Sequence, residues 1–223
     1  MIISKQKEFK ELLRMVKELD IFIIGCGKCA AKLHVGGEPE VLEMKNRLSS
    51  EGKNITGWAV LSTACSPGSW KEVLGQNPGI GKADALLVMS CGCGASVLSK
   101  LAEIEVYPAL DTESLGGICS EELVKEQCRM CGECEIWLYG GICAHSQCAK
   151  SLLNGPCGGA VDGRCEVDEL PCAWEGIYDR LKKLGKLEYL EFVHEPKDYS
   201  KKRGGIEIEL QKKNILKKIH CDC

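Results

Sequence analysis

Short apolar runs alternate with amphipathic segments through the first half of the chain. Three runs stand out and a weaker one follows: residues 21–25 (IFIIG), 57–64 (GWAVLSTA), 83–90 (ADALLVMS) and 103–109 (EIEVYPA). The length of these runs and their content of β-branched and aliphatic residues predict buried strands.

Helical spacing of apolar residues fills the segments around these strands. In segment 5–18, Phe9, Leu12 and Val16 recur at helical intervals, which predicts an amphipathic helix. Further helices are predicted over residues 39–51, 68–75 and 95–102. Strands that alternate with helices are typical of a parallel sheet covered on both faces. We therefore expect an N-terminal three-layer α/β domain over residues 1–118.

Cysteines follow the first three predicted strands closely. Cys26 and Cys29 come after the first strand, Cys65 after the second and Cys91 after the third. The carboxyl ends of parallel strands share one edge of the sheet, so we expect these four thiols to converge. Four thiolates suit a tetrahedral metal ion or a [4Fe–4S] cluster, and we predict one such cluster here.

Other interpretations compete at this edge. Residues 25–30 (GCGKCA) fit the dinucleotide fingerprint G-x-G-x-x-A, although thiols occupy the place where a pyrophosphate would lie. CGKC at 26–29 also resembles a thioredoxin-type redox pair, which leaves the other two cysteines unexplained. Each cysteine alone is also compatible with a buried free thiol at a strand end. Cys93 is an alternative ligand to Cys91, which follows its strand more directly.

Eight cysteines crowd the second half, after a short helix predicted over residues 120–127. The C-x2-C-x2-C pattern at 128–134 is that of the opening of the bacterial ferredoxin motif, whose usual C-x3-C-P continuation is absent. A more distant cysteine must then act as the fourth ligand. Eight cysteines divide into two sets of four, but spacing alone does not assign the sets. The eight are Cys128, Cys131, Cys134, Cys143, Cys148, Cys157, Cys165 and Cys172.

Zinc ribbons and iron–sulfur clusters fit this half equally well on chemistry alone. His145 could ligate zinc, although an exposed loop histidine is the commoner case. Nearby glycines allow tight turns and let backbone N–H groups approach sulfur. We predict at least one [4Fe–4S] cluster that draws on the 128–134 run, and a second centre, cluster or zinc, from the remaining cysteines. A mostly irregular or helical cysteine-rich domain is expected over residues 119–175.

A helix and a basic tail complete the chain. Ile177, Leu181 and Leu184 share one face of a helix predicted over residues 174–192. The stretch 197–218 is rich in lysine and arginine and contains a strand-like IEIEL. We expect a third unit, residues 176–223, to form this helix and an extended arm. The charge run is either a solvated face or a surface that contacts a partner.

Composition decides how the cysteines are interpreted. The chain has 223 residues with 16 Cys, and its net charge of −3 indicates neither nucleic acid nor a membrane surface as a partner. The N-terminus lacks a signal peptide, and no stretch approaches the roughly 18 apolar residues of a membrane span. We therefore expect a cytoplasmic protein. Clustered thiols in a reducing compartment indicate metal ligands or redox centres rather than a disulfide framework.

Three stretches of the second half carry a family resemblance. CRMCGECEIWLYGGIC, CAKSLLNGPCGG and GRCEVDELPCAWEGIYDRLKKLGKLEYL resemble the methylenetetrahydrofolate reductase C-terminal domain family. IGCGKCA, the GGEPEV turn and DALLVMSCGCG extend the resemblance upstream, so that it covers residues 20–192. Stand-alone members of this family are small iron–sulfur subunits that accompany a flavin-bearing reductase in acetogenic bacteria and related anaerobes.

The resemblance implies [4Fe–4S] clusters, and in some members Zn²⁺, with all twelve cysteines named above as ligands. It implies a non-catalytic subunit of one-carbon metabolism (the Wood–Ljungdahl pathway). Such a subunit relays electrons between ferredoxin, or another iron–sulfur protein, and the flavin of a methylenetetrahydrofolate reductase catalytic subunit. This chain departs from the family pattern at Ala144, where a proline is usual, and in four extra cysteines that we take as non-ligands: Cys93, Cys119, Cys221 and Cys223.

Two other functions remain open at this stage. A zinc-stapled scaffold would organise the reductase complex without redox activity. A thiol–disulfide oxidoreductase would need only the CGKC pair. The colour of anaerobically purified protein distinguishes the first two possibilities, since clusters are brown and zinc sites are colourless.

Overall fold

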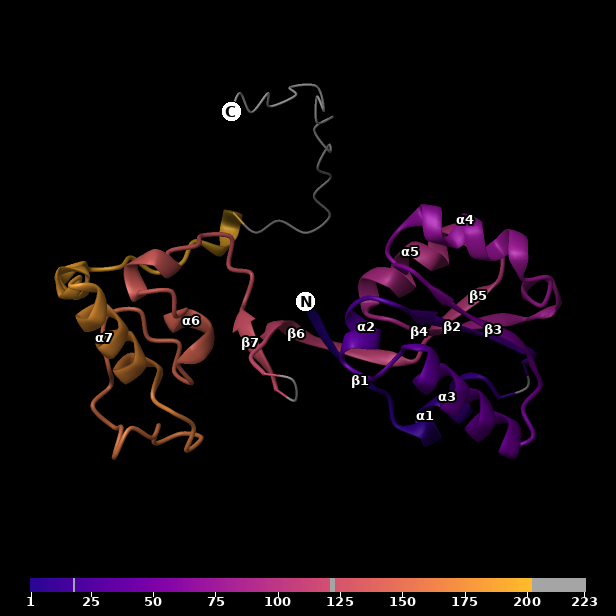
Figure 1. The fold of residues 1–223 in the computed structure, drawn as a ribbon, viewed down its shortest axis with the longest axis horizontal. Coiled ribbons are helices and arrows are strands. Elements are labelled where there is room, and N and C mark those ends of the chain that lie inside the picture. The colour runs from indigo at the N-terminus through magenta and orange to yellow at the C-terminus, as the bar shows by residue number, and fades with distance from the viewer. Residues whose placement is uncertain (18, 121–122, 202–223) are drawn as a thin grey trace, which may run out of the picture.

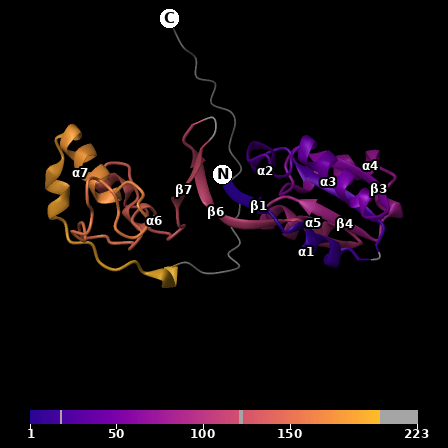
Figure 2. The same cartoon turned by 90° about the horizontal axis from the view of Figure 1, so that it is seen from below.

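Two lobes joined by a small antiparallel sheet make up the molecule (Figures 1 and 2). The computed structural model describes residues 1–17, 19–120 and 123–201. The predicted strand IEIEL and the last two cysteines lie outside the described residues. Among the helices that are described, none is long and apolar enough to cross a bilayer.

The N-terminal lobe contains a four-stranded parallel sheet in the order β3-β2-β4-β5. Its strands are β2 (Ile21–Cys26), β3 (Ile55–Leu61), β4 (Ala85–Met89) and β5 (Glu105–Pro108). All the residues of β2 and β4 are buried, as expected for central strands with both faces covered. The predicted parallel sheet is therefore confirmed.

Helices cover both faces of this sheet, with α1 and α3 on one side and α4 and α5 on the other (Figure 1). The four are α1 (Phe9–Met15), α3 (Glu38–Ser50), α4 (Pro67–Gln76) and α5 (Gly92–Leu101). Two short helical turns, α2 (Cys29–Lys32) and η1 (Ile80–Lys82), lie in the connections. The three-layer α/β architecture predicted from the sequence is confirmed.

The joining sheet was not predicted. It has the strand order β1-β6-β7, with β1 (Ile2–Gln6), β6 (Leu110–Ile118) and β7 (Val124–Cys128). The helix predicted over 120–127 is wrong because this segment pairs with β6 from Val124 onward. Likewise, the first helix begins at Phe9 rather than residue 5. Pairing between distant segments has overridden local helix preference in both places.

The C-terminal lobe is built mostly from turns and short helices, as predicted for the cysteine-rich segment. These are η2 (Ile136–Tyr139), α6 (Ala144–Gln147), α7 (Ala173–Leu184), η3 (Leu187–Glu191) and η4 (Tyr199–Lys201). Gly185, with φ of +65°, ends α7 in the left-handed conformation typical of a helix terminus. The helix predicted over 174–192 therefore stops earlier, and its remainder forms η3.

Candidate metal centres

The first three strands of the parallel sheet end at a common edge. In the ladder, Cys26 lies opposite Leu61 of β3, and Gly25 lies opposite Met89 of β4. Cys65 comes four residues after Leu61, and Cys91 comes two residues after Met89. The loops after all three strands thus begin at the same height, as the sequence predicted.

Close packing brings the loop after β3 against the start of α5. A Cβ atom on Gly94 would lie 2.8 Å from the Cβ of Ala64, so only glycine permits this approach. Ala64 precedes Cys65, and Gly94 follows Cys93. Cys91 is the N-cap of α5, shortly after the end of β4.

Three of the four predicted ligands lie around Cys93. Partial burial raises the pKa of the Cys93 thiol, although the residue as a whole is exposed. The negative charges of Cys91, Cys65 and Cys29 raise this pKa further, and a hydrogen bond links Cys93 to Cys91. The structure thus brings together Cys29, Cys65, Cys91 and Cys93.

Cys26 has a different environment from the other thiols at this edge. It is buried in the hydrophobic cluster that also contains Ala30, Ala64 and Ala95. Cys26 and Cys29 are both free thiols, so no disulfide joins the CGKC pair. The dinucleotide interpretation loses support as well, because α2 has only four residues and supplies little helix dipole.

Four cysteines of the C-terminal lobe line one cavity of about 460 Å³, here called the first cysteine pocket. They are Cys128, Cys131, Cys134 and Cys143. The first three come from the C-x2-C-x2-C run, and the fourth follows η2. Cys143 is therefore the distant cysteine that lines this cavity together with the 128–134 run.

Backbone and side-chain groups approach the sulfurs of this pocket. The backbone N–H of Met130 donates to Cys128 Sγ at 3.2 Å, in a residue with φ of +52°. Cys131 Sγ lies 3.3 Å from the carbonyl oxygen of Glu133. His145 also lines the cavity, but its Nε2 is 2.9 Å from the hydroxyl of Tyr199.

The ionisable groups of this pocket are partly shielded from water. Burial lowers the pKa of His145, and the charges of Arg129 and Lys197 lower it further. Burial also raises the pKa of Tyr139 far above its usual value, with smaller contributions from Glu135 and Cys143.

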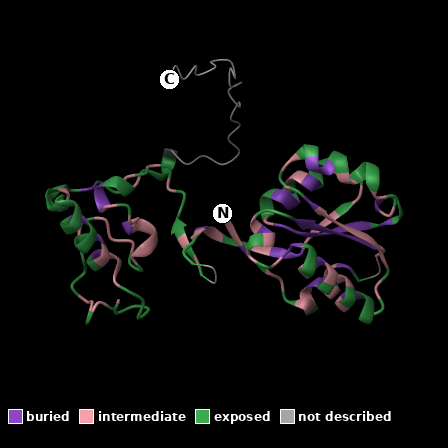
Figure 3. Cartoon of the chain, viewed as in Figure 1, coloured by how far each residue is buried: buried purple, intermediate pink, exposed green. Residues whose placement is uncertain are grey.

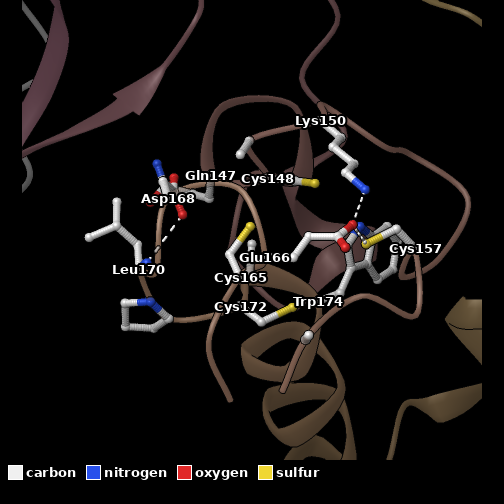
Figure 4. Close-up of a pocket in the computed structure, with 14 residues that line it drawn as sticks. Gln147, Cys148, Lys150, Cys157, Cys165, Glu166, Asp168, Leu170, Cys172 and Trp174 are labelled. Atoms are coloured by element: carbon white, nitrogen blue, oxygen red, sulfur yellow. Dashed lines mark hydrogen bonds and ion pairs between the residues drawn. The ribbon is translucent and has the colours of Figure 1, made fainter. Parts of the chain in front are cut away.

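The other four cysteines line a second, much smaller cavity of about 30 Å³, here called the second cysteine pocket (Figure 4). They are Cys148, Cys157, Cys165 and Cys172. Two backbone hydrogen bonds fold this segment, from Cys165 N to Leu170 O and from Cys172 N to Gly163 O, both at 2.8 Å. The eight cysteines of the lobe thus divide into two consecutive sets of four.

A charged pair lies beside the second cysteine pocket. Glu166 accepts a hydrogen bond from Lys150, and its Oε1 lies 3.6 Å from Cys157 Sγ (Figure 4). This hydrogen bond lowers the pKa of Glu166 and raises that of Lys150. The backbone N–H of Gly159 donates to Cys157 Sγ at 3.4 Å.

The donor atoms at these sites can be compared with those that metals use in proteins. Over the described ranges, no group of three or more His, Cys, Asp or Glu side chains is arranged to hold a single metal ion. Each pocket nevertheless offers four sulfur donors, the set that clusters and structural zinc sites use. The donor types therefore fit, and the twelve ligand assignments stay predictions.

Sequence analysis missed the charged residues at both pockets. Lys197 was part of a basic run, yet its side chain is only 6% exposed and lines the first cysteine pocket. It lies more than sixty positions from Cys131 in sequence, so no local pattern links the two. Lys150 and Glu166 carry no distinguishing local signal either.

The comparisons with known proteins bear on this half of the chain. Residues 107–200 match the family model described as methylene-tetrahydrofolate reductase C terminal. The match includes both cysteine pockets and confirms the resemblance seen in the sequence there, while the upstream part of that resemblance lies mostly outside it. Comparisons with curated proteins and with solved structures gave no match. Residues 107–200 are thus similar to the methylene-tetrahydrofolate reductase C-terminal family over somewhat less than half of the chain.

Proposed function

We propose that this chain is an iron–sulfur electron-transfer subunit of a methylenetetrahydrofolate reductase complex. In this role it relays electrons between ferredoxin, or another iron–sulfur protein, and the flavin of a catalytic subunit. The observation that carries the proposal is the division of eight cysteines between two pockets, four lining each, within the family-matched segment.

Three centres follow from the donor sets. Cys26, Cys29, Cys65 and Cys91 would hold a [4Fe–4S] cluster at the sheet edge. The first cysteine pocket would hold another, since a cavity of about 460 Å³ is much larger than a single ion needs. The second cysteine pocket, at about 30 Å³, has the volume of about one water molecule and suits a single Zn²⁺ better. A [4Fe–4S] cluster supplies one-electron transfer at a potential set by its ligands and surroundings.

The residues around the first cysteine pocket bind and shield such a centre. Cys128, Cys131 and Cys134 come from one short turn, so their relative positions are restrained before a metal enters. Tyr139 and Leu153 supply apolar walls that limit water. The N–H of Met130, which donates to Cys128 Sγ, would also donate to a metal-bound sulfur there.

The test is reconstitution with a flavin-bearing methylenetetrahydrofolate reductase catalytic subunit. Full-length chain, purified without oxygen, is analysed for iron, zinc and acid-labile sulfide. Flavin reduction is then timed with reduced ferredoxin or viologen as donor, with and without the chain. We expect faster reduction in its presence, and loss of this gain with Cys131→Ala. Cys119→Ser is the matched control, because Cys119 is exposed and lies outside both sets.

A zinc-stapled scaffold is the second candidate, and the small volume of the second cysteine pocket favours it. On that hypothesis the purified chain is colourless, contains zinc without sulfide, and still binds the catalytic subunit. Equal rates of flavin reduction with and without the chain would reject the electron-transfer role in favour of this one.

A further inference from the structure

A segment near the end of the described chain crosses the first cysteine pocket. Residues 194–199, here called the strap, run without helix or strand up to the start of η4 and are held by hydrogen bonds at both ends. Near its start, Asn154 exchanges two hydrogen bonds with the backbone of His194, at 2.6 and 2.9 Å. The His194 ring stacks on Tyr139, with ring centroids 4.8 Å apart. At the far end, the hydroxyl of Tyr199 meets His145 Nε2.

Lys197, in the middle of the strap, reaches the turn that carries the pocket's cysteines. Its Nζ donates to the carbonyl oxygen of Glu133 at 3.0 Å. The same oxygen lies 3.3 Å from Cys131 Sγ, so one atom separates the ammonium from a ligand sulfur. Lys197 also forms an ion pair with Glu135, the residue after Cys134.

The two members of this ion pair differ in exposure. The Lys197 side chain is 6% exposed and that of Glu135 is 37% exposed. Water therefore screens the carboxylate more than the ammonium. The charge of the ammonium is therefore less screened at Cys131 than that of the opposing carboxylate. A fixed strap holds a lysine here, although this flexible residue is rarely so deeply buried.

Resting on the proposed function, we propose that Lys197 sets the reduction potential of the centre held by Cys128, Cys131, Cys134 and Cys143. Reduction adds one electron from the donor, with no bond made or broken, and makes the pocket more negative by one unit. A nearby buried cation stabilises the reduced form more than the oxidised form. Lys197 is thus a positioning residue for electron transfer, acting through the field at the sulfurs.

The experiment is a redox titration of the anaerobically purified full-length chain, followed by visible bleaching and electron paramagnetic resonance. The redox transition that disappears in Cys131→Ala is the one that belongs to the centre in the first cysteine pocket. At a fixed applied potential, Lys197→Met should lower the ratio of reduced to oxidised centre at least tenfold. This corresponds to a fall of about 59 mV in the one-electron reduction potential. Lys197→Arg should restore most of this shift. Glu135→Gln keeps the ammonium and removes the opposing charge, so it should shift the couple in the opposite direction.

Lys186→Met is the matched control, since Lys186 pairs with the exposed Glu188 outside both pockets. Unmoved potentials in iron-loaded Lys197→Met and Glu135→Gln would overturn the inference and leave the proposed function intact. If Lys197→Met loses iron, the Glu135→Gln variant decides between the outcomes. A shift in the direction opposite to that expected for Lys197→Met supports the inference, and any other result overturns it. A wild-type chain without iron would overturn the proposed function, and this inference with it.

Discussion

The two lobes bury their side chains to very different extents. The described N-terminal lobe has two hydrophobic clusters of 14 and 10 buried residues, whereas the cluster in the C-terminal lobe has six. Figure 3 shows the contrast as buried strands in one lobe and mostly exposed turns in the other. The cysteines at the sheet edge therefore lie on a framework that apolar burial can stabilise. Those of the C-terminal lobe lie on turns around a much smaller hydrophobic cluster.

Backbone conformation shows the same difference. Among the described residues, five non-glycine residues have positive φ, and only the first is in the N-terminal lobe: His34, Met130, Ser151, Asp162 and Glu169. Such conformations cost of the order of 1–3 kcal/mol each. Four of them in a lobe with a small core leave little net stability from burial alone. On the proposed function, metal binding would supply the balance, because structural sites couple ligand binding to folding.

Removal of metal is the change that should make the two lobes differ most in stability. After anaerobic chelation, we expect the C-terminal lobe to lose most of its amide protection against hydrogen exchange and the N-terminal lobe to keep its own. Structural zinc in small domains contributes roughly 10–16 kcal/mol, which is comparable with everything that six buried side chains supply at about 1.5–3 kcal/mol each. Hydrogen exchange followed by mass spectrometry compares β4 with α7 directly. Equal protection of α7 before and after chelation would remove the distinction between the lobes.

The contrast also explains which elements could be predicted from the sequence. Strands such as IFIIG are buried on both faces, so their apolar runs are visible without knowledge of any partner. β6 contains Asp111, Glu113 and a Gly-Gly pair, which are poor strand signals. A Cβ on Gly116 would lie 2.4 Å from the Ile3 side chain, so this glycine is needed only once the strands have paired. Such long-range packing leaves no periodicity in the sequence.

Prediction of the sites was limited in the same way. Convergence at the sheet edge followed from the strand pattern, because parallel strands fix where their carboxyl ends lie. In the C-terminal lobe, the spacing of the cysteines did not reveal which four share a pocket. That information lies in the path of the turns and in the strap. The position of Lys197 beside Cys131 depends on contacts with Asn154 and His145, which no local motif records.

Matched cysteine substitutions should separate the lobes next. Cys131→Ala and Cys65→Ala should each lower the iron content by about one cluster. Because Cys131 lies in the lobe with the smaller hydrophobic cluster, its substitution should also lower the melting temperature. Cys65 is exposed at the edge of an intact core, so the melting temperature of Cys65→Ala should change little. Anaerobic calorimetry with iron analysis makes the measurement, and equal destabilisation by the two variants would contradict the argument.

Two truncations test the strap with a smaller expected effect. Deletion of residues 202–223 leaves the strap in place, so the iron content should not change. Deletion of residues 193–223 removes Lys197 and Tyr199, opens the first cysteine pocket to water, and should lower iron by up to about four atoms per chain. The basic tail from Lys197 onward was predicted as a partner surface, and Lys197 lies instead at the first cysteine pocket. We now expect residues 202–223 to make that contact, so the shorter deletion should weaken association with the catalytic subunit alone. Full iron content after the longer deletion would show that the strap is dispensable.

The smallest effect is expected at Cys93, which distinguishes two ligand sets for the sheet-edge centre. If Cys26, Cys29, Cys65 and Cys91 are the ligands, Cys93→Ser keeps the iron and slightly shifts the spectrum, because it alters the hydrogen bond to Cys91. Cys26→Ser should then release that cluster, although the serine is almost isosteric. The reverse outcome, iron lost with Cys93→Ser and kept with Cys26→Ser, would assign the site to Cys93 and the three cysteines around it instead. Cys26 would then be a core residue of β2, buried as its 7% exposure allows.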